Sequence, residues 1–79
     1  MNLKIYSIPT CSTCKEAKKY LKDRDIFYED INLADKDSRD ERAYYRSLNI
    51  DKLPVIVLGN SILVGWDVDI EKRLNELLR

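Results

Sequence analysis

Residues 8–21 read IPTCSTCKEAKKYL and hold both cysteines of the chain, Cys11 and Cys14, with two residues between them. A helical pattern starts at this pair, because Cys14, Ala17 and Leu21 recur at helical spacing and lysines occupy the other side. Two thiols at the start of a helix can form part of a metal site, a structural disulfide or a redox-active pair. The rest of the sequence helps to distinguish a metal site, a structural disulfide and a redox-active pair.

The chemistry of Cys11 depends on where the helix begins. Residues three apart inside a helix have Cβ atoms about 5 to 6 Å apart, whereas a disulfide needs about 3.5 to 4.5 Å. If Cys11 is the N-cap or first-turn residue, the pair can close, and the positive end of the helix favours a thiolate. Such positions lower a cysteine pKa from about 8.5 to roughly 3.5 to 7.5.

A second helix-start pattern competes with this arrangement. Thr13 and Glu16 form the T-x-x-E pattern of a capping box, which would begin the helix later and leave Cys11 in a loop. We expect the earlier start, because Pro9-Thr10 already ends the preceding apolar run.

Length and charge narrow the class of protein. The 79 residues predict a single domain, residues 1–79, with a thin core, because so short a chain buries only about 60% of its unfolded surface. Acidic and basic residues number 14 each, so no overall field attracts nucleic acid or a membrane. The N-terminus lacks the apolar core of a signal peptide, and no apolar run approaches the roughly 20 residues of a membrane span. We expect a monomer located in the cytoplasm. Closely spaced thiols of cytoplasmic proteins are typically catalytic or metal-binding.

Two predicted strands flank the first helix. They cover residues 2–8 and 27–33, and the second places Phe27, Ile31 and Leu33 on one side at period two. A strand, a helix and a strand this close together predict a right-handed crossover with parallel strands.

The second half predicts a helix, a hairpin and a last helix. A capping-box pattern at Ser38 and Glu41 begins a helix that runs to about Leu48. Strands at residues 55–58 and 62–64 flank the turn pair Gly59-Asn60. The helical side chains expected to face inward are Tyr44, Tyr45, Leu48, Ile70, Leu74, Leu77 and Leu78, and Arg79 is expected to complement the dipole at the end of the last helix. The order β-α-β-α-β-β-α predicts an α/β fold of thioredoxin type, a four-stranded mixed sheet flanked by helices.

Metal binding and redox catalysis remain as alternatives for the cysteine pair. A structural zinc site needs four ligands, and the chain has two cysteines and no histidine. Zinc or an iron–sulfur cluster would therefore have to be shared between two chains or completed by carboxylates. We expect no metal site within the chain, and we favour disulfide exchange, in which Cys11 attacks a partner disulfide and Cys14 resolves the mixed disulfide.

Three segments together resemble the glutaredoxin-like branch of the thioredoxin superfamily along essentially the whole chain. IYSIPTCSTC (5–14) is similar to the first strand and active-site loop of that branch. KLPVIV (52–57) is similar to the segment whose proline is cis and faces the cysteines, and VGWDVDIEKRL (64–74) to the glycine-aromatic approach to the last helix. The resemblance implies a cis bond before Pro54, which would expose the Leu53 backbone to a partner strand.

Within that branch, LPVIVLGN (53–60) followed by Gly65-Trp66 and Asp69-Ile70 is most similar to NrdH-type redoxins. Those proteins pass electrons to ribonucleotide reductase and are reduced by thioredoxin reductase. The first half is also similar to arsenate reductase and Spx relatives, but they carry a helical insertion that 79 residues cannot contain. Their activities are therefore not expected here.

Departures from glutathione-using glutaredoxins bear on the reductant. Those proteins usually have Pro-Tyr between the cysteines, a basic residue three positions before the first cysteine, and Gly-Gly before the last helix. Here these positions are Ser12-Thr13, Ile8 and Val64-Gly65. The missing charge at Ile8 favours a flavoprotein reductase over glutathione, although Lys52 could compensate.

The expected site follows from the pair and the resemblance together. Cys11 is the nucleophile, Cys14 is the resolving thiol, and their disulfide is the redox group, with no bound cofactor. Trp66 is either a core anchor or a partner contact, and Asp67 is either a helix N-cap or a hydrogen-bond partner for a bound peptide or glutathione. The residues expected at the partner-binding surface are Thr10, Ser12, Thr13, Leu53, Pro54, Gly65, Trp66 and Asp67.

Overall fold

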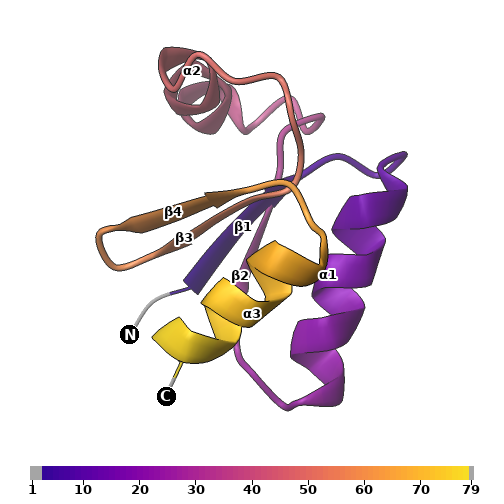
Figure 1. Ribbon diagram of the computed structural model, residues 1–79. Coiled ribbons are helices and arrows are strands. Elements are labelled where there is room, and N and C mark those ends of the chain that lie inside the picture. Colours follow the sequence, from indigo (N-terminus) through magenta and orange to yellow (C-terminus); the bar gives the residue numbers. More distant parts are fainter. Residues whose placement is uncertain (1–2, 79) are drawn as a thin grey trace.

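A computed structural model describes residues 3–78, and its elements follow the predicted order (Figure 1). The strands and helices are β1 (Leu3–Ser7), α1 (Ser12–Asp23), β2 (Glu29–Asn32), α2 (Arg39–Ser47), β3 (Val55–Leu58), β4 (Ser61–Val64) and α3 (Val68–Leu77). Met1, Asn2 and Arg79 lie outside the described residues, so the expected roles of Asn2 in the first strand and Arg79 at the last helix end are not addressed. In the described part of the chain, no helix is both long and apolar enough to cross a membrane.

The four strands form one mixed sheet in the order β2-β1-β3-β4. Strands β1 and β2 are parallel, and α1 connects them, as the short strand-helix-strand spacing predicts. The β3 strand is antiparallel to both β1 and β4, and the β3–β4 turn contains Gly59 at φ 61°, a left-handed conformation that glycine adopts without steric cost. The fold is the predicted thioredoxin-like fold.

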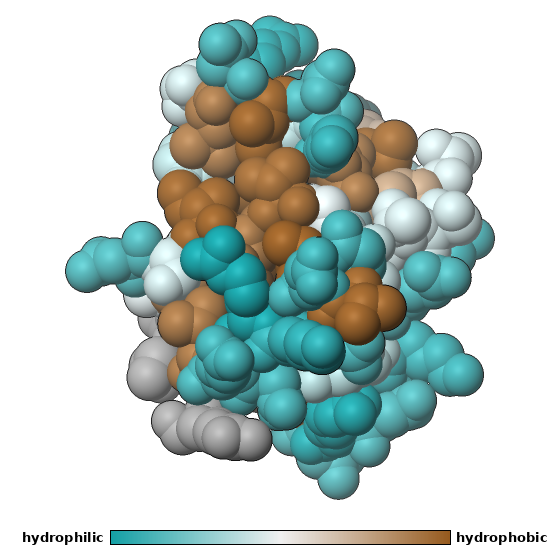
Figure 2. All heavy atoms as spheres, viewed as in Figure 1, coloured by the Kyte–Doolittle hydropathy of each residue, from teal (hydrophilic) through white to brown (hydrophobic). Residues whose placement is uncertain are grey.

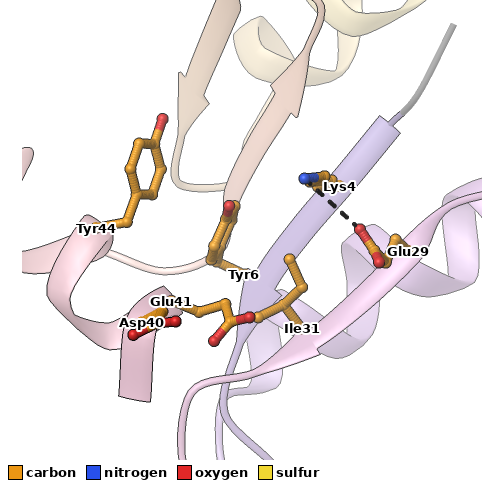
Figure 3. A pocket seen from close by; sticks show the side chains of 7 residues that line it. All are labelled: Lys4, Tyr6, Glu29, Ile31, Asp40, Glu41 and Tyr44. Carbon is orange, nitrogen blue, oxygen red and sulfur yellow. Dashed lines mark ion pairs between the residues drawn. The ribbon is translucent and has the colours of Figure 1, made fainter. Parts of the chain in front are cut away.

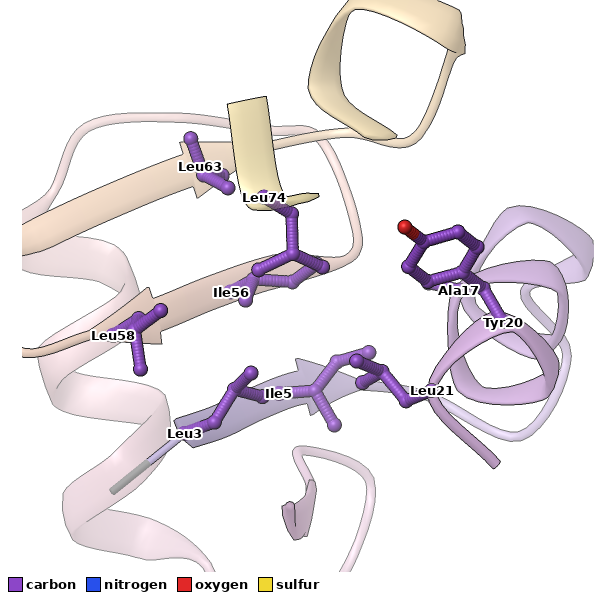
Figure 4. Close-up of a cluster of buried hydrophobic side chains, with 9 residues drawn as sticks. All are labelled: Leu3, Ile5, Ala17, Tyr20, Leu21, Ile56, Leu58, Leu63 and Leu74. Atoms are coloured by element: carbon purple, nitrogen blue, oxygen red, sulfur yellow. The ribbon is translucent and has the colours of Figure 1, made fainter. Parts of the chain in front are cut away.

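The main core lies between the sheet and helices α1 and α3. Alternate residues of the strands point to this face, because successive side chains of a strand alternate between the two faces. Leu21 of α1 and Leu74 of α3 are fully buried against Ile5 and Ile56 of the sheet (Figure 4). This cluster fixes α1, and with it the cysteine pair, against the end of β1.

A smaller cluster lies on the other face of the sheet, under α2. Tyr6 and Val55 are buried there, with Tyr45 and Leu48 half-buried against them. Figure 2 shows apolar residues gathered between α2 and the sheet. A hollow of about 240 Å³ opens beside Tyr6 under the acidic start of α2 (Figure 3). The expectation that Tyr44 faces inward is wrong: its ring lies 5.5 Å from the Tyr6 ring but stays 38% exposed at the rim.

Two further local predictions are wrong. Phe27 is 90% exposed, because β2 begins only at Glu29 and the period-two pattern does not extend back to residue 27. Ser38 occupies the N-cap position of α2, but its side chain makes no capping hydrogen bond. Its backbone N–H donates instead to the Asp35 carbonyl at 3.0 Å, which holds the chain in a turn before the helix.

Candidate active site

Cys11 is the N-cap residue of α1, as the earlier of the two start patterns predicts. Its backbone is extended, with φ −88° and ψ 113°, and its carbonyl accepts the first helical hydrogen bond, from the Lys15 N–H. The Cys14 N–H donates to the Cys11 sulfur at 3.2 Å, in the way a serine or aspartate oxygen caps a helix. The later start at Thr13 is therefore wrong, and the helix directs a free backbone donor at the sulfur.

The two thiols differ sharply in exposure. Cys11 is partly exposed, whereas Cys14 is fully buried one turn into α1; neither is in a disulfide. Burial, together with the hydrogen bond and negative charge of Cys11, raises the pKa of Cys14 to about 12. Partial burial works to raise the pKa of Cys11 as well, but hydrogen bonds from Cys14 and Thr13 outweigh it and lower that pKa below its ordinary value. Of the two thiols, Cys11 is therefore the one that ionises first.

Thr13 connects the cysteine loop to the opposite side of the site. Its hydroxyl lies 3.2 Å from the Cys11 sulfur and donates to the Leu53 carbonyl at 3.1 Å, across 40 positions of sequence. A hydroxyl has one proton, and a thiolate can only accept. When Cys11 ionises, the Thr13 hydroxyl can donate a hydrogen bond to the sulfur only if its hydrogen bond to the Leu53 carbonyl breaks. Ionisation of Cys11 and release of the Leu53 carbonyl are thus linked through one side chain.

Replacing Thr13 by valine tests this contact. The variant lacks the hydroxyl that donates to the Cys11 thiolate, and a hydrogen bond to a charged group contributes about 1.5 to 3 kcal/mol. Because the Thr13 hydroxyl gives up its hydrogen bond to the Leu53 carbonyl when it donates to the thiolate, about 0.5 to 1.5 kcal/mol of this is offset. We therefore expect the pKa of Cys11 to rise and its alkylation by iodoacetamide at pH 7 to slow by about three- to tenfold. Thr13→Ser keeps the hydroxyl and should retain the wild-type pH profile. An unchanged profile in the valine variant would show that the contact does not stabilise the thiolate.

The peptide bond between Leu53 and Pro54 is cis, as the resemblance implies. Pro54 directly follows Leu53, whose carbonyl accepts the hydrogen bond from Thr13 of the cysteine loop. Pro54 is fully buried and leads directly into β3. The Gly65 N–H donates to the Pro54 carbonyl at 2.8 Å, and Gly65 itself has φ 83°, in the left-handed region that favours glycine. The end of β4 is thereby fixed to the segment beside the cysteines.

The start of α3 shows the structural roles of Asp67 and Trp66. The Asp67 side chain accepts the Ile70 N–H at 2.9 Å, so Asp67 is the N-cap of α3. Trp66 is half-buried, and its ring lies 5.2 Å from the Tyr20 ring on the main core cluster. Trp66 therefore packs α3 against α1 while keeping part of its surface exposed.

Other predicted site residues lie around the first cysteine. Thr10 and Ser12 are exposed on either side of Cys11. Lys18 of α1 pairs with Asp30 at 3.0 Å, and Asp30 also accepts a hydrogen bond from Ser7 at 3.3 Å. Sequence reasoning missed the Thr13–Leu53 hydrogen bond, because no spacing pattern connects positions 40 residues apart.

The side chains that could bind a metal bear on the metal-binding alternative for the cysteine pair. Among residues 3–78, no group of three or more His, Cys, Asp or Glu side chains is arranged to hold a metal ion. The two sulfurs are the donors at this site, and the arrangement supports thiol chemistry: an accessible sulfur that favours the charged form, and a buried protonated thiol beside it.

Comparison with known proteins identifies the family to which the chain belongs. The family model described as glutaredoxin matches residues 3–63. The chain belongs to the glutaredoxin family. It is 41% identical over 76 residues to an uncharacterized glutaredoxin-like 8.6 kDa protein from a rubredoxin operon of Clostridium pasteurianum, covering 94% of this chain and 99% of that protein.

Solved structures of glutaredoxin-like proteins have the same fold. NrdH-redoxin from Escherichia coli, described as a glutaredoxin-like protein with a thioredoxin-like activity profile, superposes with a TM-score of 0.76 at 29% identity, over 94% of this chain and 95% of that one. A glutaredoxin from Archaeoglobus fulgidus superposes with a TM-score of 0.79 at 26% identity, over 99% and 86%. This glutaredoxin-family chain is thus a glutaredoxin-like redox protein whose two cysteines lie close together.

Proposed function

We propose that this protein is a dithiol–disulfide oxidoreductase that reduces protein disulfides. The observation that carries the proposal is the asymmetry of the pair. Cys11 is partly exposed, accepts a hydrogen bond from the Cys14 N–H and lies 3.2 Å from the Thr13 hydroxyl, whereas Cys14 is fully buried and its pKa is raised to about 12. Cys11 is therefore the thiol that ionises more easily and can attack, while Cys14 stays protonated beside it.

The first step is attack by the Cys11 thiolate on one sulfur of a partner disulfide. A bond forms between Cys11 and that sulfur, the partner's S–S bond breaks, and the second partner sulfur leaves as a thiolate. No electrons are lost in this step, because one disulfide replaces another. The negative charge moves from Cys11 to the leaving sulfur.

The second step is resolution by Cys14. Its proton passes to the partner thiolate directly or through water, and the Cys14 sulfur then attacks Cys11, so that the mixed disulfide breaks. The high pKa of Cys14 comes first from burial and then from the hydrogen bond and charge of Cys11. That charge is gone once Cys11 is in the mixed disulfide, so Cys14 releases its proton more readily at this stage. The partner sulfur that was bonded to Cys11 leaves as a thiolate and takes its proton from water, so two electrons and one proton have moved from the protein and the partner ends as a dithiol.

The partner strand would be held by the segment opposite the cysteines. When the Thr13 hydroxyl turns to the thiolate, the Leu53 carbonyl is free to accept a backbone N–H of the partner. Pro54, the next residue, is proposed to shape the groove for the partner. The surrounding residues proposed to contact the partner are Thr10, Ser12, Gly65, the exposed part of Trp66, and Asp67.

The proposed source of electrons is thioredoxin reductase, with the Cys11–Cys14 disulfide as the only redox group and no bound cofactor. Support comes from the likeness to NrdH-redoxin and its thioredoxin-like activity profile. Ile8 is hydrophobic, whereas glutathione-using glutaredoxins usually carry a basic residue at this position, and this difference also favours thioredoxin reductase as the reductant. Ribonucleotide reductase is the candidate substrate by that likeness, and we propose that the protein acts as a monomer in the cytoplasm.

Regeneration assays distinguish the two reductants. Insulin reduction would be followed with NADPH and either thioredoxin reductase or glutathione plus glutathione reductase. We expect turnover with thioredoxin reductase alone. Turnover only with glutathione would establish the second candidate, a glutathione-dependent glutaredoxin. Failure with both systems would contradict both, and zinc and iron analysis of the purified protein would then test a metal-binding role.

A further inference from the structure

The outer face of α1 carries a row of four lysines that begins at the active site. Lys15, Lys18, Lys19 and Lys22 follow Cys11 by four, seven, eight and eleven positions, which places all of them on one side of the helix. We call these four residues the lysine ridge. Together with Tyr28, they line a surface hollow of about 350 Å³.

Most of the charge on the lysine ridge is not neutralised by the protein. Lys18 is half-buried and pairs with Asp30 at 3.0 Å, and the nearby Glu29 pairs with Lys4 at 3.9 Å. The exposed Lys15, Lys19 and Lys22 have no carboxylate oxygen within 4.0 Å among residues 3–78.

The acids of α1 itself, Glu16 and Asp23, are i,i+3 and i,i+4 neighbours of Lys19 along the helix, but their carboxylate oxygens lie more than 4.0 Å from its ammonium. Because the whole chain has equal numbers of acidic and basic residues, the ridge is a local positive patch on a neutral protein.

The length of the ridge defines how much of a partner it can contact. Cys11 and Lys22 are eleven positions apart, which is about 16 Å along a helix. An extended polypeptide covers that distance in about five residues. A partner that forms a mixed disulfide with Cys11 is held at one end of the ridge, so the chain next to its cysteine is the segment that can lie along the lysines.

We propose that the lysine ridge binds an acidic segment located within about five residues of the redox cysteine of the partner protein. The inference rests on the proposed disulfide exchange at Cys11 and adds the chemistry that selects the partner. Opposite charge on the two surfaces raises the rate of encounter and fixes the orientation of the partner, and salt weakens the effect. A free anion would gain the charge contact but not the tether at Cys11.

Reduction of matched peptides tests the proposal. Each peptide has one intramolecular disulfide, flanked by four glutamates on the N-terminal side, four on the C-terminal side, or four glutamines. At low salt we expect at least one acidic peptide to be reduced about tenfold faster than the neutral peptide, and the ratio to approach one in high salt. The variant Lys15→Gln/Lys19→Gln/Lys22→Gln should lose this preference, because glutamine keeps the helix propensity and removes the charge.

A charge-matched control is Lys36→Gln/Lys72→Gln/Arg73→Gln, which removes three exposed charges away from α1 and should keep the preference. The ratio of acidic to neutral rates cancels any change in Cys11 reactivity caused by the loss of Lys15. Equal rates for all three peptides, or the same ratio in the ridge variant as in the wild type, would overturn the ridge inference alone. Failure to reduce any peptide would overturn the proposed function as well.

Discussion

Replacing Cys11 by serine is expected to lower the rate of disulfide reduction by at least about a thousandfold, since a serine hydroxyl is not ionised near neutral pH and cannot form a mixed disulfide. The variant should fold normally, because Cys11 is partly exposed and serine is a good N-cap residue. Insulin reduction with an excess of a regenerating system measures the loss.

Cys14→Ser is the matched control. It keeps the Cys11 nucleophile and its capping backbone donor, so it should form a stable mixed disulfide in a single turnover while losing catalytic turnover. Activity that survives in Cys11→Ser, or a mixed disulfide that forms equally well without Cys11, would contradict the assignment of the nucleophile.

Leu74→Ala is expected to lower the free energy of unfolding by about 2 to 5 kcal/mol. Leu74 is the one fully buried residue of α3, and it lies over Ile56 in the main cluster (Figure 4). Small domains are typically stable by only about 5 to 15 kcal/mol, so the change removes a large share of the total. Urea denaturation followed by circular dichroism gives the value.

Val68→Ala on the same helix provides the comparison. Val68 is 64% exposed in the first turn of α3, and its truncation should change the free energy of unfolding by less than about 0.5 kcal/mol. Similar losses for the two variants would mean that α3 does not depend on Leu74 for its attachment to the sheet.

Much of the fold could be predicted because its signals are local. The helix start at Cys11, the turn at Gly59-Asn60 and the N-cap at Asp67 each depend on a few neighbouring residues, and the structure has all three. The strand-helix-strand spacing implies the parallel pairing of β1 and β2. The cis bond at Pro54 required the resemblance, since most bonds before proline are trans.

The misses share a physical cause. Phe27 fits a period-two pattern, but pairing with β1 begins only at Glu29, and pairing is a tertiary property. Ser38 has the right residue type for a cap, but the turn at Asp35 sets a backbone angle at which its side chain does not reach a donor. The Thr13–Leu53 hydrogen bond depends on how two distant loops meet. Each result is decided by packing between segments, which local patterns do not contain.

Mapping the product of a single turnover tests whether Cys11 is the nucleophile and Cys14 the resolving thiol. Fully reduced protein would be mixed with an excess of an oxidised peptide, quenched with acid and alkylated, and the cysteines would be assigned by mass spectrometry. We expect one Cys11–Cys14 disulfide for each peptide reduced, with Cys11 in any mixed-disulfide intermediate. Two alkylated thiols beside an unchanged peptide, or an adduct carried by Cys14, would contradict this assignment.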